Sequence, residues 1–340
     1  MKLPSPLGLA GHTWFPPDRD LTVDAVRAGR VDAKTARELG YEGLLLAVDT
    51  APPEMAVLAA QPLLDRIGCP PDSLGTLLHA SIHYQGHDIW SAPHYIARRL
   101  GTAAQPIGLL QQCNGGATGI ELAAAALLAA PETGPALVTT ADRFLPPSWD
   151  RWLGDFGMAV GDAATAVVVH RGEYPADLML HATGTVSVPE LEEMHRGNDA
   201  FNTSSLEHSP VIDVRRTKRA FIRRHGIDRF YKAAHQGVRR AVSESLANAG
   251  LEPDDPRLRW AVLPRLGKKA MEEAYIPPLV QVTPAELLDL GTPTGHLGAG
   301  DLNASLAQLA RENRLEPGEF ALVLNSGGGF TFSSFIVGRP

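Results

Sequence analysis

One cysteine stands where an apolar run gives way to a small-residue turn and then to an Ala-rich stretch. The residue is Cys113, in the sequence LLQQCNGGATGI that begins at Leu109. A thiol at such a strand-to-helix junction lies at the positive end of the helix dipole, which favours the thiolate. A thiolate placed there is suited to take an acyl group from a thioester. The alternative is a buried structural cysteine, the usual fate of a free thiol.

A second reactive pair lies in the glycine-rich stretch GHLGAGD, in which His296 and Asp301 stand five residues apart. A histidine titrates near neutral pH and can take a proton from a thiol or a hydroxyl group. An aspartate can fix its tautomer and stabilise the imidazolium. The pattern predicts a nucleophile, a base and an orienting acid at Cys113, His296 and Asp301. A locally bonded loop histidine and a helix N-cap aspartate are the alternatives.

Three consecutive glycines follow an apolar run near the end of the chain, in the sequence NSGGGF from Asn325 to Phe330. Such a turn lets backbone N–H groups point at one spot. We expect the amide of Gly328 to form an oxyanion hole together with the amide of Cys113. A flexible turn is the alternative.

These residues fall in two stretches that repeat each other in pattern. A helix, a Gly and Pro stop and an apolar strand occur over Val57–Ser81 and again over Val238–Leu263. A second helix–strand unit occurs over Thr118–Thr140 and again over Leu302–Leu324. Strands that are continuously apolar indicate a sheet covered by helices on both faces. We therefore expect a duplicated α/β protein, although chance similarity of such common units is the alternative.

The duplication divides the chain into an N-terminal half, residues 1–170, with the nucleophilic cysteine and a C-terminal half, residues 171–340, with the His/Asp and Gly-rich loops. It also pairs the helix after Cys113 with the helix that begins near Asp301. Both helix starts then lie near a pseudo-twofold axis. The polar segment Glu190–Gly226 breaks the pattern and is long for a connection, which favours a functional loop.

Composition limits the class of protein. The chain has 340 residues and a formal net charge of −7, which argues against nucleic acid as a partner. Its two cysteines, Cys69 and Cys113, are too few for a disulfide framework and have no metal-ligand spacing. We expect no metal, no signal peptide at the N-terminus and no apolar run of the ~20 residues needed to span a bilayer. A cytoplasmic protein is expected.

Three stretches resemble the β-ketoacyl-acyl carrier protein synthase III family. They are Cys113 in its small-residue turn, the segment FGMAVGDAA from Phe156 to Ala164, and GGGFT from Gly327 to Thr331. The resemblance implies the thiolase fold, a duplicated five-layer α/β/α/β/α arrangement, over nearly the whole chain. It also implies a homodimer and no permanently bound cofactor.

Two positions depart from the pattern of condensing members of that family. Where these carry a His after the strand of the second half, this chain has Arg265, and where they carry an Asn it has His296. That His/Asn pair polarises a malonyl thioester, so the exchange should impair decarboxylative condensation. Arg265 would then face the substrate in place of the missing His.

The altered pattern resembles a divergent branch of acyltransferases in natural-product pathways, including polyketide and antibiotic biosynthesis. The resemblance implies an acyl donor bound to an acyl carrier protein or to coenzyme A. The acceptor would be a small molecule with a hydroxyl group, which includes a sugar. A decarboxylative condensing enzyme is the first alternative. A non-catalytic partner subunit is the second, although such subunits usually lose the nucleophile.

Further substrate contacts follow from the resemblance. His195 lies in the irregular segment from which a histidine lines the acceptor pocket in this branch. Trp149 and Arg151 stand where family members contact pantetheine or the nucleotide of coenzyme A, and an aromatic–Arg pair can stack and bind phosphate. A surface-loop role for His195 and core packing of the tryptophan are the alternatives. His83, His87 and His94 suit no regular metal site and are expected to be loop residues.

A basic run on this acidic protein predicts a docking surface for the acidic carrier protein. The residues expected to form it are Arg215, Arg216, Lys218 and Arg219. A solvated helix face is the alternative.

Overall fold

The strand order of the sheet occurs twice along the chain. The computed structural model describes residues 1–146, 148–204 and 206–340. Five strands of the first half pair in the order β1–β7–β6–β4–β5, and five of the second half in the order β8–β12–β11–β9–β10. The antiparallel pairing of β1 with β8, with Leu7 opposite Leu180, joins both sets into one ten-stranded sheet.

The bounds of these strands are β1 (Lys2–Trp14), β4 (Thr76–Ala80), β5 (Gln105–Leu109), β6 (Ala136–Asp142), β7 (Ala163–His170), β8 (Leu178–Ser187), β9 (Leu258–Val262), β10 (Glu286–Leu288), β11 (Phe320–Gly327) and β12 (Thr331–Gly338). In each half the two strand pairings at the outer edge of the sheet are parallel and the others are antiparallel: β4 pairs parallel with β5 and β6, as β9 does with β10 and β11. The pairing pattern is therefore duplicated as well as the strand order.

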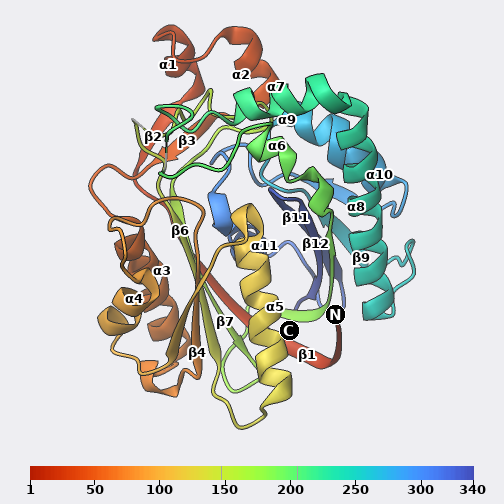
Figure 1. The fold of residues 1–340 in the computed structure, drawn as a ribbon. Coiled ribbons are helices and arrows are strands. Elements are labelled where there is room, and N and C mark those ends of the chain that lie inside the picture. The colour runs from red at the N-terminus through yellow and green to blue at the C-terminus, as the bar shows by residue number, and fades with distance from the viewer. Residues whose placement is uncertain (147, 205) are drawn as a thin grey trace.

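Helices fill three layers around the sheet. On one outer face lie α3 (Pro52–Ile67) and α4 (Ala92–Leu100), and on the other lies α8 (Ile227–Ala249) (Figure 1). Between the two halves of the sheet lie α5 (Gly115–Ala129) and α11 (Asp301–Arg311). The duplicated five-layer α/β architecture expected from the sequence is confirmed. The boundary at residue 170 stays a prediction, with β7 ending at His170 and β8 beginning at Leu178.

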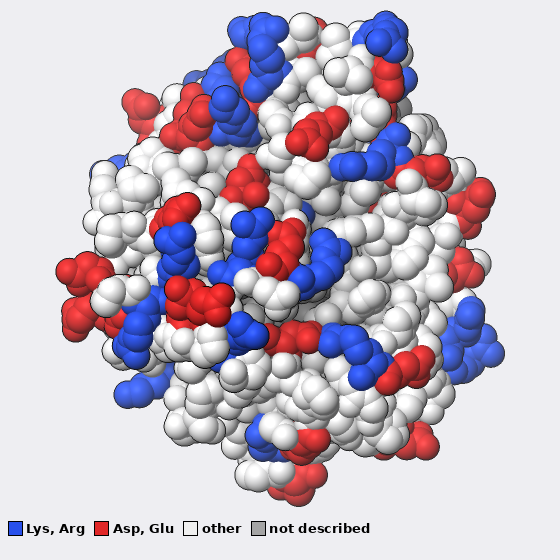
Figure 2. Space-filling model, turned by 180° about the vertical axis from the view of Figure 1, so that it is seen from behind, with Lys and Arg blue, Asp and Glu red and all other residues white. Residues whose placement is uncertain are grey.

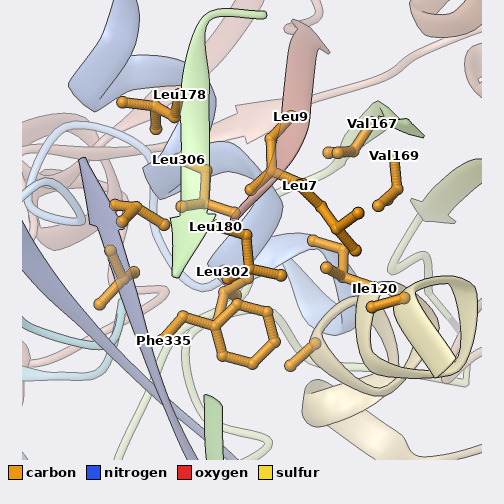
Figure 3. Packing of buried hydrophobic residues seen from close by; sticks show 14 of the residues in the cluster. Leu7, Leu9, Ile120, Val167, Val169, Leu178, Leu180, Leu302, Leu306 and Phe335 are labelled. Carbon is orange, nitrogen blue, oxygen red and sulfur yellow. The ribbon is translucent and has the colours of Figure 1, made fainter. Parts of the chain in front are cut away.

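The core follows the same layers. The central cluster joins α5 and α11 to both halves of the sheet, with Ile120, Leu302 and Phe335 fully or almost fully buried (Figure 3). A second cluster packs α3 and α4 on the first half, and a third packs α8 on the second half. The first turns of α5 are buried and are built largely from Gly and Ala, which let neighbouring backbones approach.

The expected stop signals end the two outer helices. Gly68 after α3 and Gly250 after α8 adopt left-handed conformations, with φ of 66° and 69°. This backbone geometry suits glycine because it has no Cβ. The helix–stop–strand repeat seen in the sequence is thus the repeat α3–β4 and α8–β9.

Smaller elements complete the chain. They are β2 (Asp18–Leu21), β3 (Gly43–Leu46), α1 (Thr22–Arg27), α2 (Ala33–Leu39), α6 (Glu193–Arg196), α7 (Val214–His225), α9 (Lys268–Ala270), α10 (Ile276–Val280), the 3₁₀ turns η1 (Pro71–Ser73), η2 (Gln112–Asn114), η3 (Pro189–Leu191) and η5 (Gly298–Gly300), and the π-helical turn η4 (Met271–Tyr275). The segment 190–226 is not irregular throughout, because α7 occupies its last third. The N-cap residue of α7 is Asp213, whose side chain accepts a hydrogen bond from the Arg216 N–H.

Charges on the surface are mixed rather than segregated by sign. On the face seen in Figure 2, basic and acidic side chains lie next to one another. Several ion pairs join two exposed partners, such as Arg27 with Asp24 and Arg240 with Glu244. Among the described residues, the helices include none with the length and hydrophobicity to cross a membrane.

Candidate active site

Cys113 lies in the turn that connects the edge strand β5 to the central helix α5. It is the middle residue of η2 and is 8% exposed. The Asn325 side-chain amide donates to its carbonyl oxygen at 3.0 Å, which ties the turn to β11. The preceding residue, Gln112, has a φ of 49°, an unfavourable conformation for a residue with a side chain. The sulfur is therefore fixed by the backbone at the start of a helix.

The second half brings His296 to this sulfur. The Nε2 atom of His296 lies 3.0 Å from the Sγ atom of Cys113, and both side chains are buried. The backbone of His296 is held on both sides: its N–H donates to Ala159, and its carbonyl oxygen accepts from Gly161, each at 2.9 Å. The conspicuous segment from Phe156 to Ala164 thus positions the base rather than contacting the sulfur.

Asp301 completes the chain of contacts. Its Oδ2 atom lies 2.6 Å from Nδ1 of His296, and its Oδ1 atom accepts the Leu297 N–H at 2.7 Å. Asp301 is the first residue of α11 and is 1% exposed, and the N-cap position belongs to Gly300. The carboxylate therefore orients the imidazole and closes the loop that carries it.

The electrostatics of this chain favour a charged imidazole. Burial lowers the pKa of His296, but the carboxylate of Asp301 and the neighbouring Cys113 outweigh it and hold this pKa well above its usual value. An imidazolium in contact with a sulfur favours the thiolate. The arrangement can activate Cys113 as a nucleophile and return a proton to a leaving group.

The two loops interlock where the helices α5 and α11 begin. A Cβ atom on Gly116 would lie 2.7 Å from the carbonyl oxygen of Ala299, so only glycine permits this approach. The Asp142 carboxylate, at the end of β6, accepts the N–H of Ala299 at 2.9 Å and those of Ile82 and His83 at 2.8 and 3.0 Å. Burial raises the pKa of Asp142 to about 7 against these donors.

A cavity of about 380 Å³ opens onto Cys113 and His296. Its walls are largely apolar and include Met194, Ile222, Phe230 and Phe330. Gly327 and Gly328 also line it, beside the nucleophile, where the sequence places the oxyanion hole. The assignment of Gly328 and the Cys113 amide to that hole stays a prediction.

Only one of the further substrate residues named from sequence lines this cavity. His195 does, with its ring packed on Phe330 at 5.3 Å between centroids. Arg151 instead forms two bonds to Asp162, at 2.8 and 2.7 Å. Trp149 is 8% exposed and packs on Phe144, so the structure favours the core-packing alternative for it.

Arg265 lies outside the cavity, although its neighbour Leu266 lines it. Its guanidinium is fully buried and donates to the Leu290 carbonyl oxygen, the Thr294 hydroxyl and the Gln308 amide, at 2.7, 2.9 and 2.8 Å. Arg265 therefore does not face the substrate cavity, contrary to the expectation from sequence. The side chain points toward the segment that leads into His296.

The basic run forms helix α7, but its basic side chains point in different directions and have different partners. Lys218 lines the cavity and contacts both oxygens of Asp155 at 2.7 Å. Arg216 pairs with Asp199, and Arg215 donates to the Asp155 carbonyl oxygen at 2.8 Å. Arg219 is exposed and lies over the Phe156 ring, 5.1 Å from its centroid.

The three histidines expected in loops lie apart from the cavity wall. His83 packs near Phe144 and His87 near Trp90. His94 is not a loop residue, because it lies in the first turn of α4, where it contacts the Ser91 hydroxyl at 2.6 Å. Its position just after Ser91 and Pro93, at the beginning of an amphipathic stretch, indicates a helix start.

Sequence reasoning missed several residues around the cavity. Tyr275, at the end of the π-helical turn η4, shares a 2.7 Å hydrogen bond with the Ser326 hydroxyl, and both line the cavity. Such π-helical turns are frequent at functional sites. Asp142 was detectable as a polar residue at the end of an apolar strand. The pairing of Asp155 with Lys218, 63 residues later, had no local signal.

Comparison with known proteins identifies the family. No family model and no curated protein sequence matches this chain. A solved structure named ChlB3 and described as an acyltransferase is 31% identical over 99% of this chain and 98% of its own, with a TM-score of 0.85. The chain belongs to the β-ketoacyl-acyl carrier protein synthase III-like acyltransferases of the thiolase superfamily.

More distant members share the fold. The 3-oxoacyl-[acyl-carrier-protein] synthase III of Aquifex aeolicus is 16% identical over 98% of this chain and all of its own, with a TM-score of 0.76. AbyA1, named as a tetronic acid condensing enzyme, is 20% identical over 98% of this chain and 99% of its own, with a TM-score of 0.73. The fold is therefore shared by proteins named for acyl transfer and by proteins named for condensation.

Proposed function

We propose that this synthase III-like enzyme transfers an acyl group from a carrier-protein or coenzyme A thioester, through Cys113, to a hydroxyl acceptor. The observation that carries the proposal is the buried contact chain from Cys113 through His296 to Asp301, together with the burial of Arg265 away from the cavity. Acyl transfer requires one nucleophile and one base, and the cavity presents both.

The first half-reaction loads the enzyme. His296 Nε2 takes the Cys113 proton, and the sulfur attacks the thioester carbonyl carbon. The carbon–sulfur bond to the carrier thiol then breaks, and that thiol leaves with the proton from His296. The product is a thioester between the acyl group and Cys113. Asp301 holds the imidazole in orientation throughout.

The second half-reaction discharges the acyl group. His296 Nε2 takes the proton of the acceptor hydroxyl, and its oxygen attacks the acyl carbon. The bond from that carbon to Cys113 breaks, and the sulfur recovers the proton from His296. No carbon dioxide is lost, and no second polarising donor is needed.

A decarboxylative condensation is the second candidate, because the fold is shared with a protein named as a condensing enzyme. By resemblance, that reaction uses a His and an Asn to polarise the malonyl thioester. Here the first position is Arg265, hydrogen-bonded to Leu290 and Thr294, and the second is His296, engaged with Cys113. These contacts favour transfer over condensation.

We further propose that a carrier protein docks on the first half of α7, with Arg219 as its main basic contact. Arg219 and Arg215 flank the exposed ring of Phe156 at 5.1 and 5.0 Å, and Phe156 also lines the cavity. An acidic carrier helix there would place its pantetheine arm toward Cys113. The homodimer and the role in polyketide or antibiotic biosynthesis remain proposals drawn from the resemblance.

Mass spectrometry of the purified protein tests the function. Incubation with an acyl N-acetylcysteamine thioester should add one acyl mass to the peptide that contains Cys113, and addition of an acceptor alcohol should remove it with formation of an ester. Cys69, the other free cysteine, is the internal control and should stay unmodified. An unmodified Cys113 with every donor tried contradicts the proposal.

A further inference from the structure

Three polar side chains line the acyl cavity outside the Cys113–His296–Asp301 chain and lie together in it. Asp155 and Lys218 come from different parts of the chain, and His195 comes from α6. The transfer chemistry described above uses none of the three. Burying such groups is costly, so their presence in a mostly apolar cavity calls for a ligand or a structural reason.

Asp155 and Lys218 form a buried ion pair. The ammonium lies 2.7 Å from each carboxylate oxygen, and the two side chains are 1% and 14% exposed. Asp155 also accepts the Gly157 N–H at 2.7 Å. An ion pair of this kind is not a strong source of stability, because desolvation offsets its attraction. Lys218 has three N–H donors, and among the described residues only Asp155 accepts from it.

His195 is neutral and incompletely bonded. Burial, reinforced by the charge of Lys218, lowers the pKa of His195 to about 4. Its Nδ1 atom is buried and has no hydrogen-bond partner among the described residues. A buried polar atom without a partner is rare in folded proteins. The side chain that carries this atom lines the catalytic cavity.

The position of His195 relates this cluster to the reacting group. Its ring is so close to Gly328 that a Cβ atom on that glycine would lie 2.8 Å from the imidazole. Gly328 lies in the cavity wall with Cys113, so a group that contacts His195 is within the reach of an acyl chain on that sulfur. Phe330, Phe230 and Met194 provide apolar surface around it.

We propose that His195 and the Asp155–Lys218 pair form a specificity-determining subsite for an uncharged hydroxyl group on the acyl chain. The inference rests on the proposed function. An ion pair beside a neutral imidazole has no net charge, so it suits a hydroxyl group better than a carboxylate. The unused Lys218 donor and the incompletely bonded His195 imidazole supply a donor and an acceptor for such a group. The surrounding aromatic side chains suit a flat acyl body.

The test compares donors that differ by one hydroxyl group. Rates of acyl mass gain on Cys113 are measured with N-acetylcysteamine thioesters in the pairs benzoyl and ring-hydroxylated benzoyl, at each ring position, and butyryl and 3-hydroxybutyryl. Carboxybenzoyl serves as the charged analogue. We expect at least one hydroxylated donor to load about tenfold or more faster than its parent, since a site built to bond a hydroxyl rejects the analogue without it. The carboxylated donor should gain no such advantage.

Variants assign that preference to the subsite. His195→Leu should reduce the ratio to about one without abolishing loading of the unsubstituted donor. His195→Asn should keep part of the preference because its amide can accept and donate hydrogen bonds as the imidazole does. The double variant Asp155→Asn/Lys218→Met removes the pair without leaving a lone buried charge and should also lose the preference. Arg240→Gln, on the exposed face of α8, is the control.

Equal loading of parent and hydroxylated donors by the wild-type enzyme overturns the subsite while leaving acyl transfer intact. The subsite is also overturned if the preference survives in His195→Leu. The same holds if the preference arises only when the acyl group is discharged to the acceptor. Failure of every donor to modify Cys113 overturns the proposed function as well, so the two failures are distinguishable.

Discussion

Two loops of the C-terminal half use similar positions for different purposes. The loop from Leu263 to Gly267 follows β9, and the loop from Gly295 to Asp301 precedes α11. The second presents His296 to the sulfur of Cys113 at 3.0 Å. The first carries Arg265, whose guanidinium is fully buried and bonded away from the cavity. One loop supplies chemistry and the other supplies support.

The contacts of Arg265 explain how the supporting loop acts. Its guanidinium donates to Leu290 and Thr294, which lie just before Gly295 and His296. Its backbone carbonyl accepts the Tyr41 hydroxyl at 3.1 Å. The position that polarises a malonyl thioester in condensing relatives therefore holds the catalytic loop in place here.

The largest effects should come from the catalytic loop and its nucleophile. Cys113→Ala should abolish acyl loading, because no other described group in the cavity is a thiol. His296→Ala should lower the loading rate about 10²–10⁴-fold, the usual contribution of a general base. Stopped-flow or quenched mass spectrometry measures both rates. Loading of His296→Ala within threefold of wild type would contradict the role of this loop.

The orienting carboxylate should matter almost as much. Asp301→Asn should lower the rate about 10²-fold or more, because the imidazole loses both its orientation and its counter-charge. Circular dichroism should show an unchanged fold, and Asp289→Asn, on the neighbouring segment, is the matched carboxylate control. An equal loss of rate in both variants would indicate a general effect on the loop instead.

The pH dependence of Cys113 sharpens the contrast between the two free cysteines. The Asp301 carboxylate holds the pKa of His296 well above its usual value, so the imidazole in contact with the Cys113 sulfur is positively charged at pH 6. Cys69 is packed in the hydrophobic cluster of α3 and α4, and its thiol lies beside the Ser73 hydroxyl and the Pro70 carbonyl oxygen. Iodoacetamide at pH 6 should label Cys113 about tenfold or more faster than Cys69. Similar labelling of both in a peptide-resolved experiment would remove the imidazolium argument.

The supporting loop should show its role in stability. Arg265→Met leaves buried oxygen acceptors without a donor and should lower the free energy of unfolding by about 3 kcal/mol. Arg259→Met, exposed on β9, should change it by less than about 0.5 kcal/mol. Urea unfolding measures both values. A stable Arg265→Met enzyme would mean that the buried guanidinium does not hold the catalytic loop.

The smallest effect concerns docking. Arg219→Glu should slow loading from an acyl carrier protein about three- to tenfold at low salt while leaving loading from an N-acetylcysteamine thioester unchanged. Arg240→Glu, on the outer helix α8, is the control, and added salt should reduce the difference between the two. Unchanged carrier-protein kinetics in Arg219→Glu would remove the docking surface from α7.

Much of the frame was predictable because local signals determine it. The helix stops, the apolar strands and the two glycine-rich turns are all local patterns, and their repetition implies that α5 and α11 meet. What failed was the direction of long polar side chains. Lys218 turns inward because Asp155 lies 63 residues away in sequence but 2.7 Å away in space, and Arg151 turns to Asp162 for the same reason. Such pairings depend on tertiary packing that no local pattern encodes.

The most direct test of the comparison between the two loops starts from enzyme already acylated at Cys113. A malonyl thioester and an alcohol acceptor are added, and carbon dioxide and products are measured together. The account predicts ester formation without release of carbon dioxide above the Cys113→Ala background. Stoichiometric carbon dioxide with a β-ketoacyl product would show that condensation proceeds without a second polarising side chain, and would contradict the assignment of this enzyme to acyl transfer.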